Sequence, residues 1–323
     1  MRSLRRGDTV EVRTAQEILA TLDERGELDA LPFMPEMVPY CGRRLTVDRR
    51  ASKVCDTIAY SGSLDIADSV LLDELRCDGA GHGGCQAECR YYWKEAWLRR
   101  VGPDDPHSGP DDAEATEKLL RLATANATNG LEDSALRYRC QATQALAAGT
   151  SLSTKDPRPY LRELTSRNVS VGRFSRVMGR AIVYETQQKL GRLPNPPLRG
   201  MGPSSPKLPT LELKPGDWVR VKSPSEIRST LNDKGKNRGL WFDREMLPFC
   251  GETFQVRRRI DRLVDETSGA LIELTSDCVT LEGTVCSGER STGRWMCPRA
   301  VYPYWREGWL ERVERPPCEV SQP

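Results

Sequence analysis

The sequence predicts an α+β protein made of two repeated small SH3-like β-barrel modules with cysteine-rich metal sites, joined by a helical insert. Three observations support this prediction. A set of motifs occurs twice along the 323 residues, each copy contains short alternating segments typical of β-strands, and most of the eleven cysteines lie in the two copies. The predicted boundaries are residues 1–102 for the first copy, 103–210 for the insert and 211–323 for the second copy.

The two copies align under a nearly constant shift along the sequence. The shift is 209 residues without a gap up to the second cysteine cluster, and after three inserted residues it becomes 212. Chance does not produce such a match, so the chain is an internal tandem duplication. The matched positions include Gly7-Asp8 with Gly216-Asp217, Cys41-Gly42 with Cys250-Gly251, Cys77 with Cys286, Cys85 with Cys297, and Trp93 and Trp97 with Trp305 and Trp309.

Each copy opens with an alternating strand, followed by a short helix and two more strands. The helix follows Thr14 or Ser223 with Glu three residues later, the pattern of a capping box, and Gly26 or Gly235 is expected to end it. Short strands around one helix favour an SH3-like barrel, with a small α+β sandwich as the alternative. The expected strands are 8–13, 43–50 and 69–76 in the first copy and 217–221, 252–259 and 278–285 in the second, and the expected helices are 15–22 and 224–231.

An aromatic segment closes each copy, at 91–101 and 302–313. Trp93 and Trp97 are four residues apart, which predicts that they share one face of a short helix. We expect them to fill the core of the barrel, and a stacking platform for a ligand is the alternative.

The insert contains helical patterns between an acidic, proline-rich linker at 102–117 and a second linker at 193–209. An excess of positive charge over residues 154–200 is interpreted as a solvated helix face rather than a polyanion site. The expected helices are 114–125, 134–147, 159–166 and a long one that follows Ser170, with an apolar stripe of Phe174, Val177, Met178, Ala181 and Ile182.

Composition narrows the function classes. The net charge is +2, which argues against a polybasic nucleic-acid binder. No apolar run approaches the roughly 18 residues that a membrane span needs, and the N-terminal stretch lacks the apolar segment of a secretory signal. We therefore expect a cytoplasmic protein, in which cysteines persist as thiols or metal ligands rather than as disulfides.

The cysteines predict two metal centres. Four thiolates satisfy a tetrahedral zinc ion or the corners of a cubane iron–sulfur cluster, and buried thiols or disulfides are the alternatives. Iron–sulfur is favoured over zinc because the Cys-x-x-Cys spacing of zinc knuckles is absent. His82 is a further candidate ligand, although a histidine in a glycine-rich loop is usually only exposed. The predicted ligands are Cys41, Cys55, Cys77, Cys85, Cys89 and His82 in the first copy and Cys250, Cys278, Cys286 and Cys297 in the second.

Several segments resemble a group of cysteine-rich tandem-repeat proteins of bacteria that occur in biosynthetic gene neighbourhoods. They are GCQAEC and WKEAWL in the first copy and CPRAVYPYWREGWL in the second. The resemblance covers both copies and implies a family but no settled activity.

Two functions follow as hypotheses. The first is a metal-binding cytosolic protein, iron–sulfur or zinc, that serves as a redox component or cluster-dependent enzyme in a biosynthetic pathway, with a small-molecule substrate or a redox partner protein. The second is a zinc-stabilised, non-enzymatic adaptor that binds a protein or nucleic acid.

No phosphate-binding loop, serine-hydrolase motif or metalloprotease motif is present, so the sequence leaves open whether the protein is an enzyme. Ahead of its aromatic segment the first copy has five cysteines and the second has four. This surplus thiol and His82 suggest that the first site is the more reactive one, and simple packing of Cys55 or Cys89 is the alternative.

Overall fold

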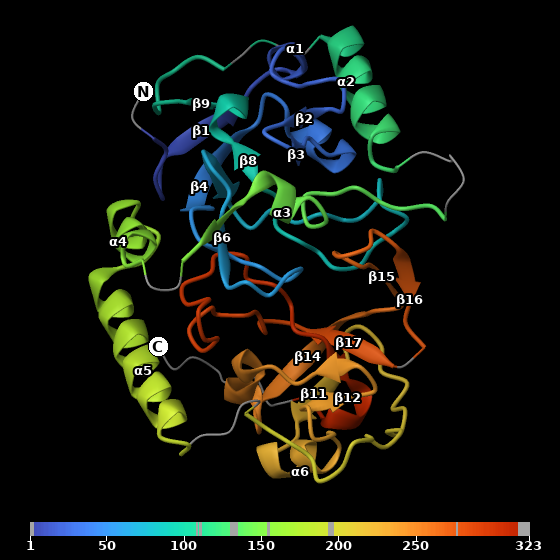
Figure 1. Ribbon diagram of the computed structural model, residues 1–323. Helices are drawn as coiled ribbons and strands as arrows, with labels where there is room; N and C mark the ends of the chain where they lie inside the picture. Colours follow the sequence, from blue (N-terminus) through green and yellow to red (C-terminus); the bar gives the residue numbers. More distant parts are fainter. Residues whose placement is uncertain are drawn as a thin grey trace, which may run out of the picture. The chain divides into compact units, whose positions relative to one another are not determined.

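A computed structural model describes residues 3–107, 109, 112–129, 135–153, 156–192, 197–275 and 277–315 (Figure 1). The chain divides into two compact units, each described here by itself. Unit 1 comprises residues 1–182, 262–273 and 287–301, and unit 2 comprises residues 183–261, 274–286 and 302–323. Two segments of the second copy therefore belong to unit 1, so the compact units and the predicted sequence segments are different divisions of the chain.

Unit 1 contains a five-stranded antiparallel sheet in the order β8-β7-β4-β1-β9 (Figure 1). Three of its strands lie where the alternating patterns predict them, within residues 8–13, 43–50 and 69–76, and the other two lie in the aromatic segment at 91–101. The bounds are β1 (Thr9–Val12), β4 (Arg44–Arg50), β7 (Ser69–Leu72), β8 (Trp93–Lys94) and β9 (Leu98–Arg100). The other elements of this unit are α1 (Ala15–Leu19), β2 (Glu27–Leu28), β3 (Leu31–Pro32), η1 (Pro35–Tyr40), β5 (Val54–Cys55), β6 (Ser63–Asp65), η2 (Glu95–Trp97), α2 (Ala113–Ala125), α3 (Ala145–Ala148), β10 (Thr150–Leu152), α4 (Arg158–Thr165), β15 (Arg262–Val264) and β16 (Leu271–Glu273), together with the part of α5 (Val171–Lys189) that ends at Ile182.

Unit 2 repeats this sheet in the order β18-β17-β14-β11-β19. The register repeats as well, because Thr9 pairs with Thr46 in unit 1 and Trp218 pairs with Gln255 in unit 2. Each sheet also has an irregularity at the same point, between Val47 and Arg49 or between Val256 and Arg258. The elements are β11 (Trp218–Val221), α6 (Pro224–Ser229), β12 (Lys236–Asn237), β13 (Leu240–Trp241), η3 (Arg244–Phe249), β14 (Thr253–Arg259), β17 (Cys278–Leu281), β18 (Trp305–Arg306), η4 (Glu307–Trp309) and β19 (Leu310–Arg312), with the end of α5.

The fold is thus mixed helix and sheet, as predicted, and the duplication extends to strand register. Within the described ranges no sheet closes into a barrel, so the closed form of the predicted modules is absent and their SH3-like character stays a prediction.

The capping boxes are confirmed in both copies. Thr14 Oγ1 accepts a hydrogen bond from the Glu17 N–H, and the Glu17 carboxylate accepts one from the Thr14 N–H at 3.0 Å. Ser223 and Glu226 do the same in α6. The helices end earlier than expected, and Gly26 instead occupies a left-handed turn (φ +66°) whose carbonyl accepts from the Phe33 N–H.

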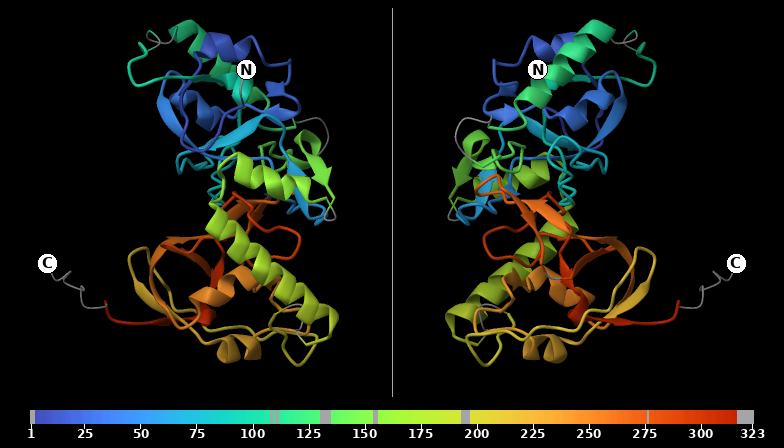
Figure 2. Two further views of the ribbon diagram at one scale, coloured as in Figure 1. Left: turned by 90° about the vertical axis from the view of Figure 1, so that its left-hand side faces the viewer. Right: turned by 90° about the vertical axis from the view of Figure 1, so that its right-hand side faces the viewer.

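The insert is helical in part. Helices α2, α4 and α5 form where the patterns predict them, and α2 packs against α1 (Figure 1 and Figure 2). In the described part of the expected helix at 134–147, only its last residues are helical, in α3. Val177 and Ala181 of the predicted stripe are buried, but Ile182 is 63% exposed. None of the helices in the described ranges is long and apolar enough to cross a bilayer.

Each core centres on one phenylalanine between two tryptophans. The Phe33 ring meets Trp97 edge-on at 5.1 Å and Trp93 at 6.1 Å, and Phe242 repeats this with Trp309 and Trp305. All four tryptophans are fully buried, which confirms that they fill the core. The predicted short helix is wrong, because Trp93 lies in β8 and Trp97 in the single turn η2.

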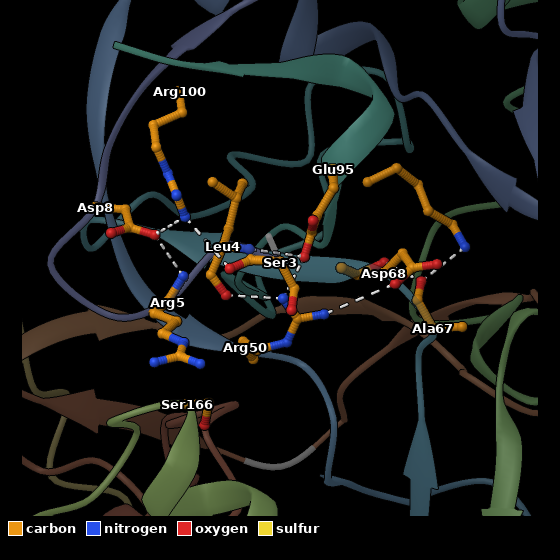
Figure 3. Close-up of polar contacts among 12 residues, drawn as sticks. Ser3, Leu4, Arg5, Asp8, Arg50, Ala67, Asp68, Glu95, Arg100 and Ser166 are labelled. Atoms are coloured by element: carbon orange, nitrogen blue, oxygen red, sulfur yellow. Dashed lines mark hydrogen bonds and ion pairs between the residues drawn. The ribbon is translucent and has the colours of Figure 1, made fainter. Parts of the chain in front are cut away.

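An arginine network also occurs twice. Arg50 pairs with Glu95 and Asp68 and donates to the Leu4 carbonyl at 2.8 Å, while Glu95 accepts from the Leu4 N–H (Figure 3). At the matched positions, Arg259 pairs with Glu307 and Asp277, and Glu307 accepts from the Leu213 N–H. In both copies this network fastens the chain before the first strand to the rest of the sheet.

We predict that Trp309→Ala lowers the free energy of unfolding by about 3–5 kcal/mol, because it leaves a cavity in the core of unit 2. It also removes the hydrogen bond from Trp309 Nε1 to Thr230 Oγ1 at 2.9 Å. Denaturant unfolding measures the change. The control is Trp241→Ala in the same unit, which removes a side chain that is 45% exposed and should change stability by about 0.5 kcal/mol or less. Equal losses in both variants would contradict this account of the core.

Candidate functional site

Cys77 follows the strand β7 and is held against Cys89, whose carbonyl accepts from the Cys77 N–H at 2.8 Å. The next turn bends the backbone around the sulfur, and the Gly79 N–H donates to Cys77 Sγ at 3.3 Å. Gly79 has a φ of +75°, and a Cβ there would lie 2.7 Å from the Cys85 nitrogen. Only glycine fits this approach, so the turn that brings Cys77 beside Cys85 depends on it.

A hairpin from the second copy completes the surroundings of Cys85. This hairpin, β15 and β16, lies in unit 1, and its Val264 N–H donates to Cys85 Sγ at 3.3 Å. The contact is reinforced by Gln86, whose N–H donates to the Arg262 carbonyl and whose side chain accepts from the Arg262 N–H. Two sulfurs, Cys77 and Cys85, therefore accept backbone N–H bonds, a feature that orients and stabilises thiolate ligands.

Cys140 is the functional candidate that the sequence reasoning missed. Its neighbour Gln141 is buried, and its side chain accepts from the Tyr92 N–H at 2.7 Å and donates to the Tyr92 and Pro32 carbonyls. The Cys140 N–H donates to Thr143 Oγ1 at 2.9 Å. These polar contacts fix an irregular segment where helix periodicity predicted a helix. The available signal was that Cys140 is the single cysteine between the two copies.

Four cysteines, Cys77, Cys85, Cys89 and Cys140, line one cavity of about 30 Å³ in unit 1. One water needs roughly 10–15 Å³ of such volume, so the space exceeds that of a single water. The wall also contains two arginines, one tyrosine and His82. The two arginines, Arg299 and Arg90, line the cavity together with Cys77, Cys85, Cys89 and Cys140.

The sulfurs surround the cavity rather than meet at a point. Among the described residues, no three of these thiols lie within 4.8 Å of one another. A tetrahedral zinc with bonds of about 2.3 Å would need sulfurs about 3.8 Å apart. Among the described residues, these thiols therefore do not form a ready single-ion site.

Burial shapes the protonation of these thiols. It raises the pKa of Cys89 to about 12 and that of Cys140 to about 11, and burial together with the charge of Glu36 raises the pKa of Cys77 strongly. Cys77, Cys89 and Cys140 therefore keep their protons near neutral pH when no cation is bound. Because a bound metal takes thiolates, loading releases protons and strengthens as the pH rises.

Glu36, Cys77 and His82 form the one group of three ligand-type side chains within 4.8 Å among the described residues. Glu36 Oε1 accepts from His82 Nδ1 at 2.7 Å and from the Gly81 N–H at 2.9 Å, and His82 Nε2 faces the Arg139 carbonyl at 3.1 Å. Both ring nitrogens thus face oxygen atoms, so the ring orients the loop and neither nitrogen is open to a metal ion. The Cys77 thiol contacts Glu36 Oε1 at 3.7 Å.

The remaining predicted ligands lie elsewhere. In unit 1, Cys41 packs against the hydrophobic core, and Cys55 contacts Cys297. Unit 2 contains the other three predicted ligands of the second copy: half-buried Cys250 and Cys286, and Cys278 buried in β17. Within the part of the chain that is described, no three of the four predicted second-copy ligands lie within 4.8 Å of one another, so the second centre stays a prediction.

A larger cavity of about 340 Å³ in unit 1 is a weaker candidate. Its wall contains paired charges: Arg50 pairs with Asp68 at 3.8 Å (Figure 3). Arg162 pairs with Asp65 at 3.1 Å. None of the described residues that line it is a cysteine or a histidine, so it offers a soft metal no ligand. The cavity lined by thiols is therefore the better site.

We predict that Gln141→Leu lowers the free energy of unfolding by about 2 kcal/mol or more, because it leaves buried backbone groups of Tyr92 and Pro32 without partners. It should also speed the alkylation of Cys140 more than that of the other cysteines. A loss of structure elsewhere in the protein would not affect Cys140 selectively. Denaturant unfolding and peptide mapping after iodoacetamide give the two readouts. Gln144→Leu, a half-buried neighbour, is the control and should do neither.

The Glu36–His82 pair predicts a pH effect. Burial alone would raise the pKa of Glu36, but the hydrogen bond and charge of His82 and the backbone N–H groups lower it below its ordinary value of 4.5. The pair therefore stabilises the protein above that pH, and its contribution is lost as the pH falls through the lowered pKa of the folded state. The stability difference between wild type and Glu36→Gln should shrink accordingly in acid.

A double-mutant cycle with His82→Gln checks the cause. If the pair is responsible, the double variant should lose less free energy of unfolding at neutral pH than the sum of the losses in the two single variants. Additive losses with the same pH dependence would reject the pair as the cause.

Comparison with known proteins gives no relative for this chain: no family model, no curated protein and no solved structure matches it. The interpretation of the site therefore depends on its residues and their geometry.

Proposed function

We propose that unit 1 binds an iron–sulfur cluster through Cys77, Cys85, Cys89 and Cys140, and that the protein acts as a redox component or cluster-dependent enzyme. The observation that carries this proposal is that four thiols from two distant parts of the chain line one small cavity. Four cysteine thiolates are the usual ligand set of cubane clusters.

The spacing of the sulfurs supports a cluster over a zinc ion. A single zinc would draw the thiolates together, whereas a cubane keeps its four ligands at separate corners around a core of iron and sulfide. The N–H bonds to Cys77 and Cys85 support the same choice, since hydrogen bonds to ligand sulfurs are one of the means by which proteins set cluster potentials.

Charge in the wall supports a buried anionic group. Four thiolates carry more negative charge than a buried site tolerates without compensation. Arg299 and Arg90 both line the cavity and are themselves buried. Each also has a carboxylate partner, Glu266 or Asp48, so the arginines remain oriented whether or not the site is filled.

The proposed partners are a small-molecule substrate or a redox partner protein in a biosynthetic pathway. A reducing compartment such as the cytoplasm suits the thiols, because the ten described cysteines are not joined in disulfides. The sheet of unit 1 then serves as an SH3-like scaffold for the site.

We predict that protein purified without oxygen is coloured and contains iron and acid-labile sulfide, about four of each per chain for one cubane. Cys140→Ser should lower the iron content as strongly as Cys85→Ser, because both thiols line the cavity. Metal analysis and the visible spectrum provide the measurement.

Cys41→Ser and Cys250→Ser are the matched controls and should retain the iron. Colourless protein with bound zinc that is lost in Cys140→Ser would favour the alternative function, a zinc-stabilised adaptor. Protein that binds neither metal would reject a metal centre altogether.

A further inference from the structure

A second pair of thiols lies in unit 1, outside the four-cysteine cavity. Cys55 is on β5, and Cys297 is in the segment 287–301 that the second copy contributes to this unit. The Cys55 N–H donates to Cys297 Sγ at 3.1 Å, although the residues are 242 positions apart in the sequence. Both residues are buried, with exposures of 9% and 5%.

Two buried cations accompany this pair. Arg299 Nη1 donates to the Cys55 carbonyl at 3.3 Å and lies 3.8 Å from Cys55 Sγ. Lys53 is two residues before Cys55, and its ammonium donates to the Trp295 carbonyl at 2.7 Å while resting on the Tyr160 ring. Positive charge beside a thiol favours the thiolate, which is the nucleophilic form.

The two sulfurs are unequal. A hydrogen bond from the Cys297 side chain lowers the pKa of Cys55; burial opposes this effect, and the charge of Arg299 reinforces it. Cys55 is thus suited to attack, and Cys297 beside it is suited to resolve the product.

The same surroundings argue against a metal at this pair. Among the described residues, Cys55 and Cys297 belong to no group of three thiols, imidazoles or carboxylates within 4.8 Å of one another. The Lys53 ammonium would also repel a cation. A pair of thiols without a third ligand among the described residues has the chemistry of a dithiol rather than of a metal site.

We propose that Cys55 and Cys297 form a peroxide-reactive dithiol, a second redox site that closes reversibly to a disulfide. The oxidant must be small because so little of either residue is exposed. The Cys55 thiolate attacks one oxygen of hydrogen peroxide, the O–O bond breaks, and Cys55 sulfenic acid and hydroxide form. The Cys297 thiol then displaces water from the sulfenic acid, so two thiols and one peroxide give one disulfide and two waters.

The test is peptide mapping of the full-length protein after one equivalent of hydrogen peroxide. Trypsin releases Cys55 in residues 54–76 and Cys297 in residues 295–299, and each peptide contains a single cysteine. We expect these two peptides to be linked by a disulfide that dithiothreitol cleaves. Oxidation of this pair should outpace that of Cys278, a buried thiol whose pKa is raised to about 12, on the order of tenfold or more.

Single variants separate the two roles. Cys297→Ser should leave a sulfenic acid on Cys55 that dimedone traps, and Cys55→Ser should leave Cys297 reduced. If both thiols of the wild type stay alkylatable while other cysteines oxidise, the proposal is wrong, and it is equally wrong if Cys55→Ser empties a metal site. The mapping does not depend on metal content, so absence of a cluster in unit 1 and absence of this dithiol are separate results.

Discussion

The candidate site depends on hydrogen bonds that hold two distant stretches of chain against the first copy. Gln141 fastens the segment of Cys140 by bonding to the backbone on both sides of Tyr92. Val264 and Arg262 fasten the hairpin of the second copy to Cys85 and Gln86. Without these contacts the thiols are ordinary residues of separate loops. Their side chains converge only because buried polar groups must find partners, and the partners are on other stretches.

The two copies share a framework but use it differently. Register, capping boxes, aromatic cores and the arginine network all repeat. The cysteine loop does not repeat in the same way. In the first copy the thiols of the loop face a cavity of unit 1, whereas in the second copy the loop itself is part of unit 1 and places Cys297 beside Cys55. The framework is constrained by packing, while the loops between its strands were able to diverge.

The sequence predicted much of the framework and only part of the site. Strand and helix positions followed from alternation, capping residues and the repeat, which are local signals. Cys77, Cys85 and Cys89 were found because they cluster in the sequence. Cys140 was not, since its role depends on Gln141 and on tertiary contacts that override helix periodicity. The contact of Cys55 with Cys297 was also beyond reach, because each residue was assigned to its own copy.

The interleaving of the two units has a consequence for how the protein is made. Unit 1 needs residues up to 301, and unit 2 begins at residue 183 and continues past residue 302. During synthesis, unit 1 cannot be completed until most of unit 2 has also left the ribosome. The first sheet can form early from local contacts, but the hairpin beside Cys85 and the segment of Cys297 arrive only near the end of translation. Thiols that a completed unit would bury therefore remain exposed on the nascent chain for most of its elongation.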